Sequence, residues 1–268
     1  MKKYTRFILP LILFILLSCT DYLCSGNQVD NRQPNCDNCR ILFIGSSYLS
    51  YAGNDVVDIF SKFCGKAGKQ VSIDTSIEGG FRLNRHIEYH PTIDKINSQG
   101  WDYVVLQGNS AYVSKEKWHQ YLVPYLTGFR QIIKDHYDKT SIIYMMPWAY
   151  LDGLTFIEGE TDTYKEMQLN IYNNSIEIAQ SIDISIAPAG WAWHKSMEQE
   201  YSELLYLNDL NHQTFEGAYL TASVLYSTIF LNKAPFIEKY SSEIVGDDFL
   251  RNIAYKIVIN DLDDWNIY

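Results

Sequence analysis

The sequence predicts an α/β fold, a three-layer α/β/α sandwich built on a mainly parallel sheet of five strands. From Arg40 to the C-terminus, short apolar runs alternate with longer segments of helical period, which is the pattern of a sheet covered by helices. The apolar runs are nearly continuous, as in strands that are buried on both faces. The 268 residues are 47% hydrophobic and 20% charged, a composition typical of one globular core.

The first 18 residues have the organisation of a secretory signal peptide. Basic residues precede an apolar run from Phe7 to Leu17, which is too short to span a ~30 Å hydrocarbon core. The ending Leu16-Leu17-Ser18-Cys19 resembles a bacterial lipobox, whose cysteine is acylated after cleavage. We therefore expect an exported cell-envelope lipoprotein that is held at a membrane by lipid on Cys19. An ordinary cleaved signal with a free or disulfide-bonded Cys19 is the alternative, and equal detergent partitioning of the wild type and of Cys19→Ser would favour it.

Residues 19–39 are rich in Ser, Gly, Asn, Gln and Asp and predict a lipid-anchored tether, so that the folded domain occupies residues 40–268. Beyond Cys19 the chain holds an even number of cysteines, which predicts disulfides in an exported protein and leaves their pairing open. These cysteines are Cys24, Cys36, Cys39 and Cys64. Although Cys36 and Cys39 have the spacing of metal ligands, no second pair follows, and we expect no metal site.

The strands and helices of the domain are predicted from hydrophobic period. Strands are expected at 41–45, 71–77, 103–106, 141–145 and 182–187, where apolar residues run together. Helices are expected at 55–64, 84–98, 116–137 and 162–180. A last long helix carries apolar residues three and four positions apart from Phe215 to Ile229, a stripe that indicates packing rather than function.

Chemistry is expected just after the strands, because ligands of open parallel sheets bind beyond the carboxyl ends of the strands. A serine hydroxyl becomes a nucleophile when a histidine takes its proton and a carboxylate orients that histidine. Ser47 follows the first strand, and Asp209 and His212 form an Asp-x-x-His pair before the last long helix. This spacing lets the carboxylate reach the imidazole on one short turn. We therefore predict a catalytic triad of Ser47, His212 and Asp209.

Acyl transfer also needs hydrogen-bond donors for the oxyanion that develops on the carbonyl. The backbone N–H groups of Ser47 and Gly80 and the side-chain amide of Asn109 follow three different strands and can supply them. Some alternatives remain open: Ser46 as the nucleophile, Gly79 as the donor, Asn109 as a plain turn residue and Asp209 as a helix cap.

Four sequence blocks together resemble the SGNH (GDSL) hydrolase superfamily, over about residues 40–232. They occur in the family's order and are ILFIGSSY, IEGG, VVLQGNS and DLNH followed by TFEGAYLTA. The resemblance implies the flavodoxin-like SGNH hydrolase fold and the same triad and oxyanion donors. The chain departs from the family at two positions, because Gly-Asp-Ser is here Gly45-Ser46-Ser47 and the Gly of Gly-x-Asn is Gln107.

Aromatic residues near the strand ends suggest the substrate. Trp148, Trp191 and Trp193 follow the fourth and fifth strands, together with His194, and flat rings there suit sugars. The alternative is that the tryptophans only pack the edge of the sheet. We predict a serine esterase that acts through an acyl-enzyme on acyl esters, by preference acetyl esters of carbohydrates.

Other functional classes remain as alternatives: a hydrolase of lipid or small aliphatic esters, an acyltransferase, and an inert surface lipoprotein that binds glycan. We do not expect nucleic acid as a partner, because the chain has 22 Lys and Arg but 32 Asp and Glu, which gives a net charge of −10. We expect no cofactor, and no glycine-rich phosphate loop is present.

Overall fold

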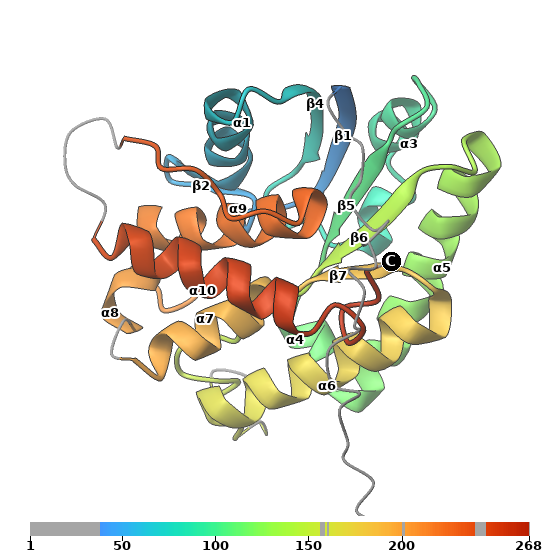
Figure 1. Cartoon of the computed structure of the whole chain (residues 1–268). Helices are drawn as coiled ribbons and strands as arrows, with labels where there is room; N and C mark the ends of the chain where they lie inside the picture. Colours follow the sequence, from blue (N-terminus) through green and yellow to red (C-terminus); the bar gives the residue numbers. More distant parts are fainter. Residues whose placement is uncertain (1–37, 156–158, 160, 200–201, 239–244, 268) are drawn as a thin grey trace, which may run out of the picture. The chain divides into compact units, whose positions relative to one another are not determined.

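The computed structural model describes residues 38–155, 159, 161–199, 202–238 and 245–267, all within one compact unit that spans residues 32–268 (Figure 1). The expected signal peptide (1–18), the lipidation site Cys19 and all but the last two residues of the expected tether (19–39) lie outside the described residues. Those last two residues, Asn38 and Cys39, already belong to the first strand. Among the described helices, none has both the length and the apolar character needed to cross a bilayer.

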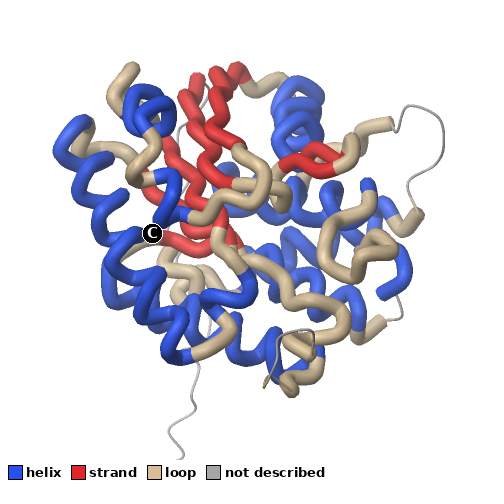
Figure 2. Tube along the Cα trace, turned by 180° about the vertical axis from the view of Figure 1, so that it is seen from behind, coloured by secondary structure: helices blue, strands red, loops and turns tan. Residues whose placement is uncertain are grey.

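Five strands form one sheet in the order β4-β1-β5-β6-β7, and every neighbouring pair is parallel. Their bounds are Gln70–Ile77 (β4), Asn38–Gly45 (β1), Tyr103–Gln107 (β5), Ser141–Met145 (β6) and Ser185–Ala187 (β7). In β1 all residues from Ile41 to Gly45 are buried, because helices cover the sheet on both sides (Figure 2). The predicted fold class is therefore confirmed.

Two layers of helices enclose this sheet. On one side α9 packs against α1, α7 and α10, and on the other α5 packs against α2, α3 and α4 (Figure 1). The helix α6 contacts both α5 and α7. The bounds are Val56–Lys66 (α1), Leu83–His86 (α2), His90–Ile96 (α3), Ser110–Val113 (α4), Glu116–His136 (α5), Tyr164–Ile182 (α6), Ala189–Met197 (α7), Ser202–Leu205 (α8), Phe215–Phe230 (α9) and Asp247–Asn260 (α10).

The order of the strands determines where a ligand can bind. From β1 the chain crosses to β4 on one side, then returns past β1 to β5 and continues outward to β6 and β7. The loops that follow β1, β4 and β5 therefore emerge side by side at the point where the direction of winding reverses. In open α/β sheets this switch point is the usual ligand site.

The structure departs from the predicted elements in several places. The helix expected at 84–98 is two helices, α2 and α3, because Pro91 lacks the N–H that a continuous helix needs and is tolerated only in the first turn of α3, after the extended residue Tyr89. The strand expected at 182–187 starts only at Ser185, since α6 continues to Ile182 and ends on Asp183 in the left-handed region (φ 54°). The helices α4, α7, α8 and α10 and the two short strands β2 (Ser50–Tyr51) and β3 (Asn54–Asp55) were not predicted.

The described cysteines do not all pair. Cys39 is disulfide-bonded, whereas Cys64 is a free thiol on the buried face of α1. Burial raises the pKa of the Cys64 thiol to about 12, so the group remains protonated and unreactive. The sequence leaves the pairing open, and the structure excludes Cys64 from the predicted disulfides because this residue is packed in the core.

Candidate active site

The structure brings Ser47, His212 and Asp209 into one line of hydrogen bonds. The Ser47 hydroxyl lies 2.8 Å from Nε2 of His212, and Nδ1 of the same ring lies 2.8 Å from Oδ2 of Asp209. With the Nδ1–H tautomer, the ring donates to the carboxylate and accepts from the hydroxyl. Ser46, the other serine of the turn, is buried and donates to a different partner, so the geometry favours Ser47.

The loop that carries Asp209 and His212 is held in place by its own backbone. Oδ1 of Asp209 accepts hydrogen bonds from the backbone N–H groups of Asn211 (3.0 Å) and His212 (2.9 Å). Leu210 between them takes a left-handed conformation (φ 59°), and its carbonyl accepts from the Leu151 N–H at 2.9 Å. These contacts orient the carboxylate before any substrate binds.

Asp209 remains ionised in this setting. Partial burial raises the pKa of Asp209, but the hydrogen bonds from the His212 and Asn211 N–H groups and from the imidazole outweigh it and bring the pKa below its ordinary value. The side chain of Asp209 is 39% exposed and that of His212 is 17% exposed. The site is therefore open to solvent at the carboxylate and more enclosed at the imidazole.

The loops after β4 and β5, the two strands on either side of β1, carry donors that no described residue accepts from. Gly80 lies in the left-handed region (φ 72°), where a side chain would be strained, and its N–H donates to no described residue. Asn109 caps α4 through its side-chain oxygen, which accepts from the Tyr112 N–H at 3.3 Å. Its Nδ2 group donates to no described residue. The cap thus fixes the plane of the amide and leaves the donor end available.

Ser46 and Gln107, the two positions at which the sequence differs from the usual SGNH motifs, contact each other in the structure. Oε1 of Gln107 accepts from the backbone N–H of Ser46 at 2.7 Å and from its hydroxyl at 3.0 Å. Gly45, just before, must be glycine, because a Cβ atom there would lie 2.6 Å from the Cβ of Gln107. Behind this turn, Nε2 of the fully buried His86 lies 2.9 Å from the Gly45 carbonyl oxygen. The turn that carries Ser46 and Ser47 is therefore held by Gln107 on one side and by His86 on the other.

Two tyrosines that were not predicted as site residues surround the imidazole. The Tyr51 ring, on the β2–β3 hairpin (Ser50–Tyr51 and Asn54–Asp55), stacks on His212 with centroids 3.7 Å apart and planes 13° from parallel. Tyr48 contacts the same ring edge-on at 5.9 Å and donates its hydroxyl to the Asn211 side chain. In the sequence, only their positions one and four residues after Ser47 could have indicated that these tyrosines lie at the site.

The expectation that Trp148 and Trp193 contact substrate is wrong. Both side chains are fully buried, and their rings stack on each other 4.1 Å apart. The Trp148 indole N–H donates to the Asn211 carbonyl at 2.9 Å, so this residue supports the histidine loop from inside the core. Trp148 and Trp193 thus pack the edge of the sheet, as the alternative interpretation of the sequence had it.

Trp191 and His194 lie on α7 and contact neither Ser47 nor His212 in the described structure. Their rings stack on each other with centroids 4.8 Å apart. Only 6% of His194 is exposed, and burial lowers the pKa of its imidazole. The structure therefore does not bring these two predicted substrate residues to the triad.

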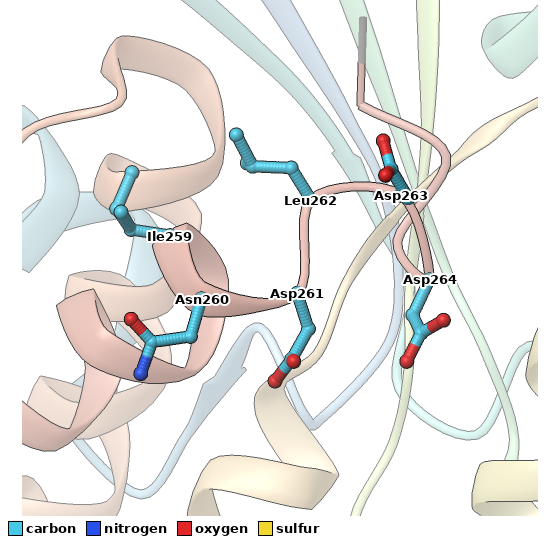
Figure 3. Close-up of a pocket in the computed structure, with 6 residues that line it drawn as sticks. All are labelled: Ile259, Asn260, Asp261, Leu262, Asp263 and Asp264. Atoms are coloured by element: carbon cyan, nitrogen blue, oxygen red, sulfur yellow. The ribbon is translucent and has the colours of Figure 1, made fainter. Parts of the chain in front are cut away.

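A separate hollow lies at the end of α10, lined by Ile259, Asn260, Asp261, Leu262, Asp263 and Asp264 (Figure 3). Its carboxylates point in different directions, and no group of three or more His, Cys, Asp or Glu side chains in the described ranges is arranged to hold a metal ion. The hollow contains no residue of the triad.

Comparisons with known proteins agree with this architecture. No protein-family model matches the chain. A viral protein, provisionally named phosphoesterase 244L of Invertebrate iridescent virus 6, is 24% identical over 142 residues. That match covers 46% of this chain and half the length of the viral protein.

Solved structures resemble the chain over most of its length. A DUF4886 family protein from Bacteroides uniformis superposes with a TM-score of 0.69 at 16% identity, covering 84% of this chain and 96% of that one. A protein provisionally assigned as an SGNH hydrolase from Slackia heliotrinireducens gives 0.60 at 18% identity, over 73% and 100%. A variant of the acetyl xylan esterase Axe2 from Geobacillus stearothermophilus gives 0.55 at 15% identity, over 75% and 97%. The chain has the fold of SGNH hydrolase structures.

Proposed function

We propose that the protein is a serine esterase that uses Ser47 as nucleophile, His212 as general base and Asp209 to orient the histidine. The observation that carries this proposal is the continuous line of hydrogen bonds through the three side chains, 2.8 Å at each step. The line lies at the switch point of the sheet, where ligands of this architecture bind.

The geometry supports a two-step acyl transfer. His212 Nε2 takes the Ser47 proton as Oγ attacks the ester carbonyl, and Asp209 stabilises the imidazolium that forms. The imidazolium then gives its proton to the departing alcohol, which leaves an acyl group on Ser47. A water molecule, deprotonated by His212, attacks that acyl group and releases the acid.

The oxyanion formed in both steps needs donors on the far side of Oγ. We propose the backbone N–H groups of Ser47 and Gly80 and the side-chain amide of Asn109 for this role. They belong to the loops after three adjacent strands, β1, β4 and β5, and none of them donates to a described residue. Donors fixed in advance stabilise a developing charge without reorganisation.

For Asn109→Ala we expect kcat to fall by roughly 10²–10³-fold with a smaller change in KM, the usual effect of removing one oxyanion donor. The fold should survive, because Asn109 also caps only the single-turn helix α4. Asn109→Ser, which retains a capping oxygen and lacks the amide donor, is the matched variant. A change confined to KM in both variants would place Asn109 in substrate binding instead.

As substrate class we propose acetyl esters of carbohydrates. The support is the structural likeness to Axe2, which is an acetyl xylan esterase, and the position of Tyr51 at the triad. Tyr51 is 38% exposed, and a phenol ring with one accessible face suits a sugar ring. The buried tryptophans give no support.

A panel of esters tests the proposed function. The purified protein is assayed with nitrophenyl acetate, butyrate and octanoate, with acetylated xylo-oligosaccharides and with nitrophenyl phosphate. We expect the acetyl esters to give the highest kcat/KM and the Ser47→Ala protein to give none above background. Preference for octanoate would indicate a lipid esterase and preference for the phosphate a phosphoesterase. Oligosaccharide binding without turnover would indicate an inert glycan-binding protein.

A further inference from the structure

Two arginines in the segment that follows β4 differ from the other arginines of the described structure. Arg40, Arg130 and Arg251 each pair with an aspartate. Arg82 and Arg85 are exposed and form no ion pair with any described carboxylate, although Glu78 and Glu88 are close in the sequence. In a chain of net charge −10, two neighbouring cations without a counterion indicate a place that an anion can occupy.

Arg82 is placed at the two loops that carry the proposed oxyanion donors. It follows Gly80 by two residues, and its NH1 group donates to the hydroxyl of Tyr112 at 2.6 Å. Tyr112 in turn follows Asn109 by three residues on α4. The guanidinium of Arg82 therefore links the segment after β4, which carries Gly80, to the helix α4 after β5, whose N-cap is Asn109.

Both guanidinium groups are held by aromatic rings. The Arg82 guanidinium carbon lies 4.3 Å from the centre of the Tyr112 ring, and that of Arg85 lies 5.5 Å from the centre of the Phe81 ring. These contacts restrain each group, and a guanidinium has five N–H donors, of which Arg82 uses one for the Tyr112 hydroxyl. A guanidinium prepared in this way loses less freedom when it binds a carboxylate through paired hydrogen bonds.

We propose that Arg82 and Arg85 form a subsite for an anionic group carried by the ester substrate, with a carboxylate as its simplest form. The inference rests on the proposed esterase function and refines its substrate class to acidic esters. The carboxylate can belong to the alcohol part, as in an acetylated uronic acid, or to the acyl part, as in a half-ester of a dicarboxylic acid.

Matched pairs of esters distinguish these two sources. Nitrophenyl butyrate and nitrophenyl hemisuccinate differ by a carboxylate on the acyl side, and O-acetylated methyl glucoside and methyl glucuronoside differ by one on the alcohol side. For the double variant Arg82→Gln/Arg85→Gln we expect kcat/KM to fall about 10- to 100-fold for the anionic member of one pair, as is typical for hydrogen bonds to charged groups. The neutral member should change less than threefold, and added salt should reduce the difference.

Arg130→Gln is the control, because it removes an arginine that already pairs with Asp183 and lies on α5. Equal losses for neutral and anionic esters would overturn the subsite and make the arginines supports of the oxyanion loops. No loss for either pair would overturn it as well. If no ester is hydrolysed, the proposed function fails separately, and binding of methyl glucuronoside to the Ser47→Ala protein then decides. Binding that requires Arg82 and Arg85 supports the subsite, and its absence refutes it.

Discussion

Ser47→Ala should abolish ester hydrolysis, with kcat reduced by roughly 10⁵–10⁶-fold, as for the loss of the nucleophile from other serine triads. The reason is direct: no other hydroxyl in the described structure lies within hydrogen-bond distance of His212 Nε2. The fold should be unaffected, because the hydroxyl is half-buried and makes only this one side-chain contact. Steady-state rates on nitrophenyl acetate and a thermal melt measure both expectations.

Ser46→Ala is the matched control, since the two serines are adjacent and only Ser47 contacts the imidazole. The Ser46 hydroxyl donates to Gln107, while the backbone N–H of Ser46 keeps the same acceptor after substitution. We expect this variant to retain most of its activity. An inactive Ser46→Ala protein together with an active Ser47→Ala protein would reverse the assignment, and mass spectrometry of a trapped acyl-enzyme identifies the acylated residue.

Asp209→Asn should lower kcat by roughly 10³–10⁴-fold while the protein still folds, because an amide can hold the wrong imidazole tautomer and does not stabilise the imidazolium. The Asn side-chain oxygen can still accept from the N–H groups of Asn211 and His212, so the loop should keep its shape. Asp183→Asn, at an exposed helix end, is the control and should leave kcat unchanged. Wild-type turnover by Asp209→Asn would remove Asp209 from the mechanism.

The same variant gives a pH dependence with a definite sign. Because the pKa of Asp209 is lowered in the folded protein, its contribution to stability is complete above the ordinary value of about 3.9 and is lost as the pH falls through the lower folded value. Asn does not titrate. The difference in Tm between wild type and Asp209→Asn should therefore be constant near neutrality and shrink below about pH 4. A difference that grows on acidification would contradict this account.

The sheet was predictable because its strands are short buried runs, and all five appear in the structure close to their expected places. The missed helices have a different origin. The helix α10 buries only Leu250, Ala254 and Val258, one residue per turn, a narrow stripe that is easily overlooked. The start of α7 at Ala189 follows β7 without a loop, so strand and helix share one apolar stretch.

The sequence pointed to Asp209 and His212 through their local spacing and to Ser47 through its position after the first strand, whereas the roles of all three stay a prediction. The aromatic residues were predicted poorly, because a ring at a strand end serves the core or the surface equally well in sequence. Trp148 and Trp193 are inside, and the exposed ring at the triad is Tyr51. Burial of this kind depends on distant elements such as α9, whose Thr221 accepts from the Trp193 indole.

The contact between Ser46 and Gln107 bears on how relatives of this chain can be recognised. An aspartate at position 46 alone would bring its carboxylate close to Oε1 of the Gln107 side chain, which is also a hydrogen-bond acceptor. A glycine at position 107 alone would leave the Ser46 hydroxyl and N–H without their acceptor. Each single step between the two arrangements is thus unfavourable, so the two positions should covary in the lineage. A sequence search that scores positions 46 and 107 independently counts two mismatches with the usual motif, although the two substitutions belong together. A search for serine at 46 together with glutamine at 107 would find the proteins that share this arrangement.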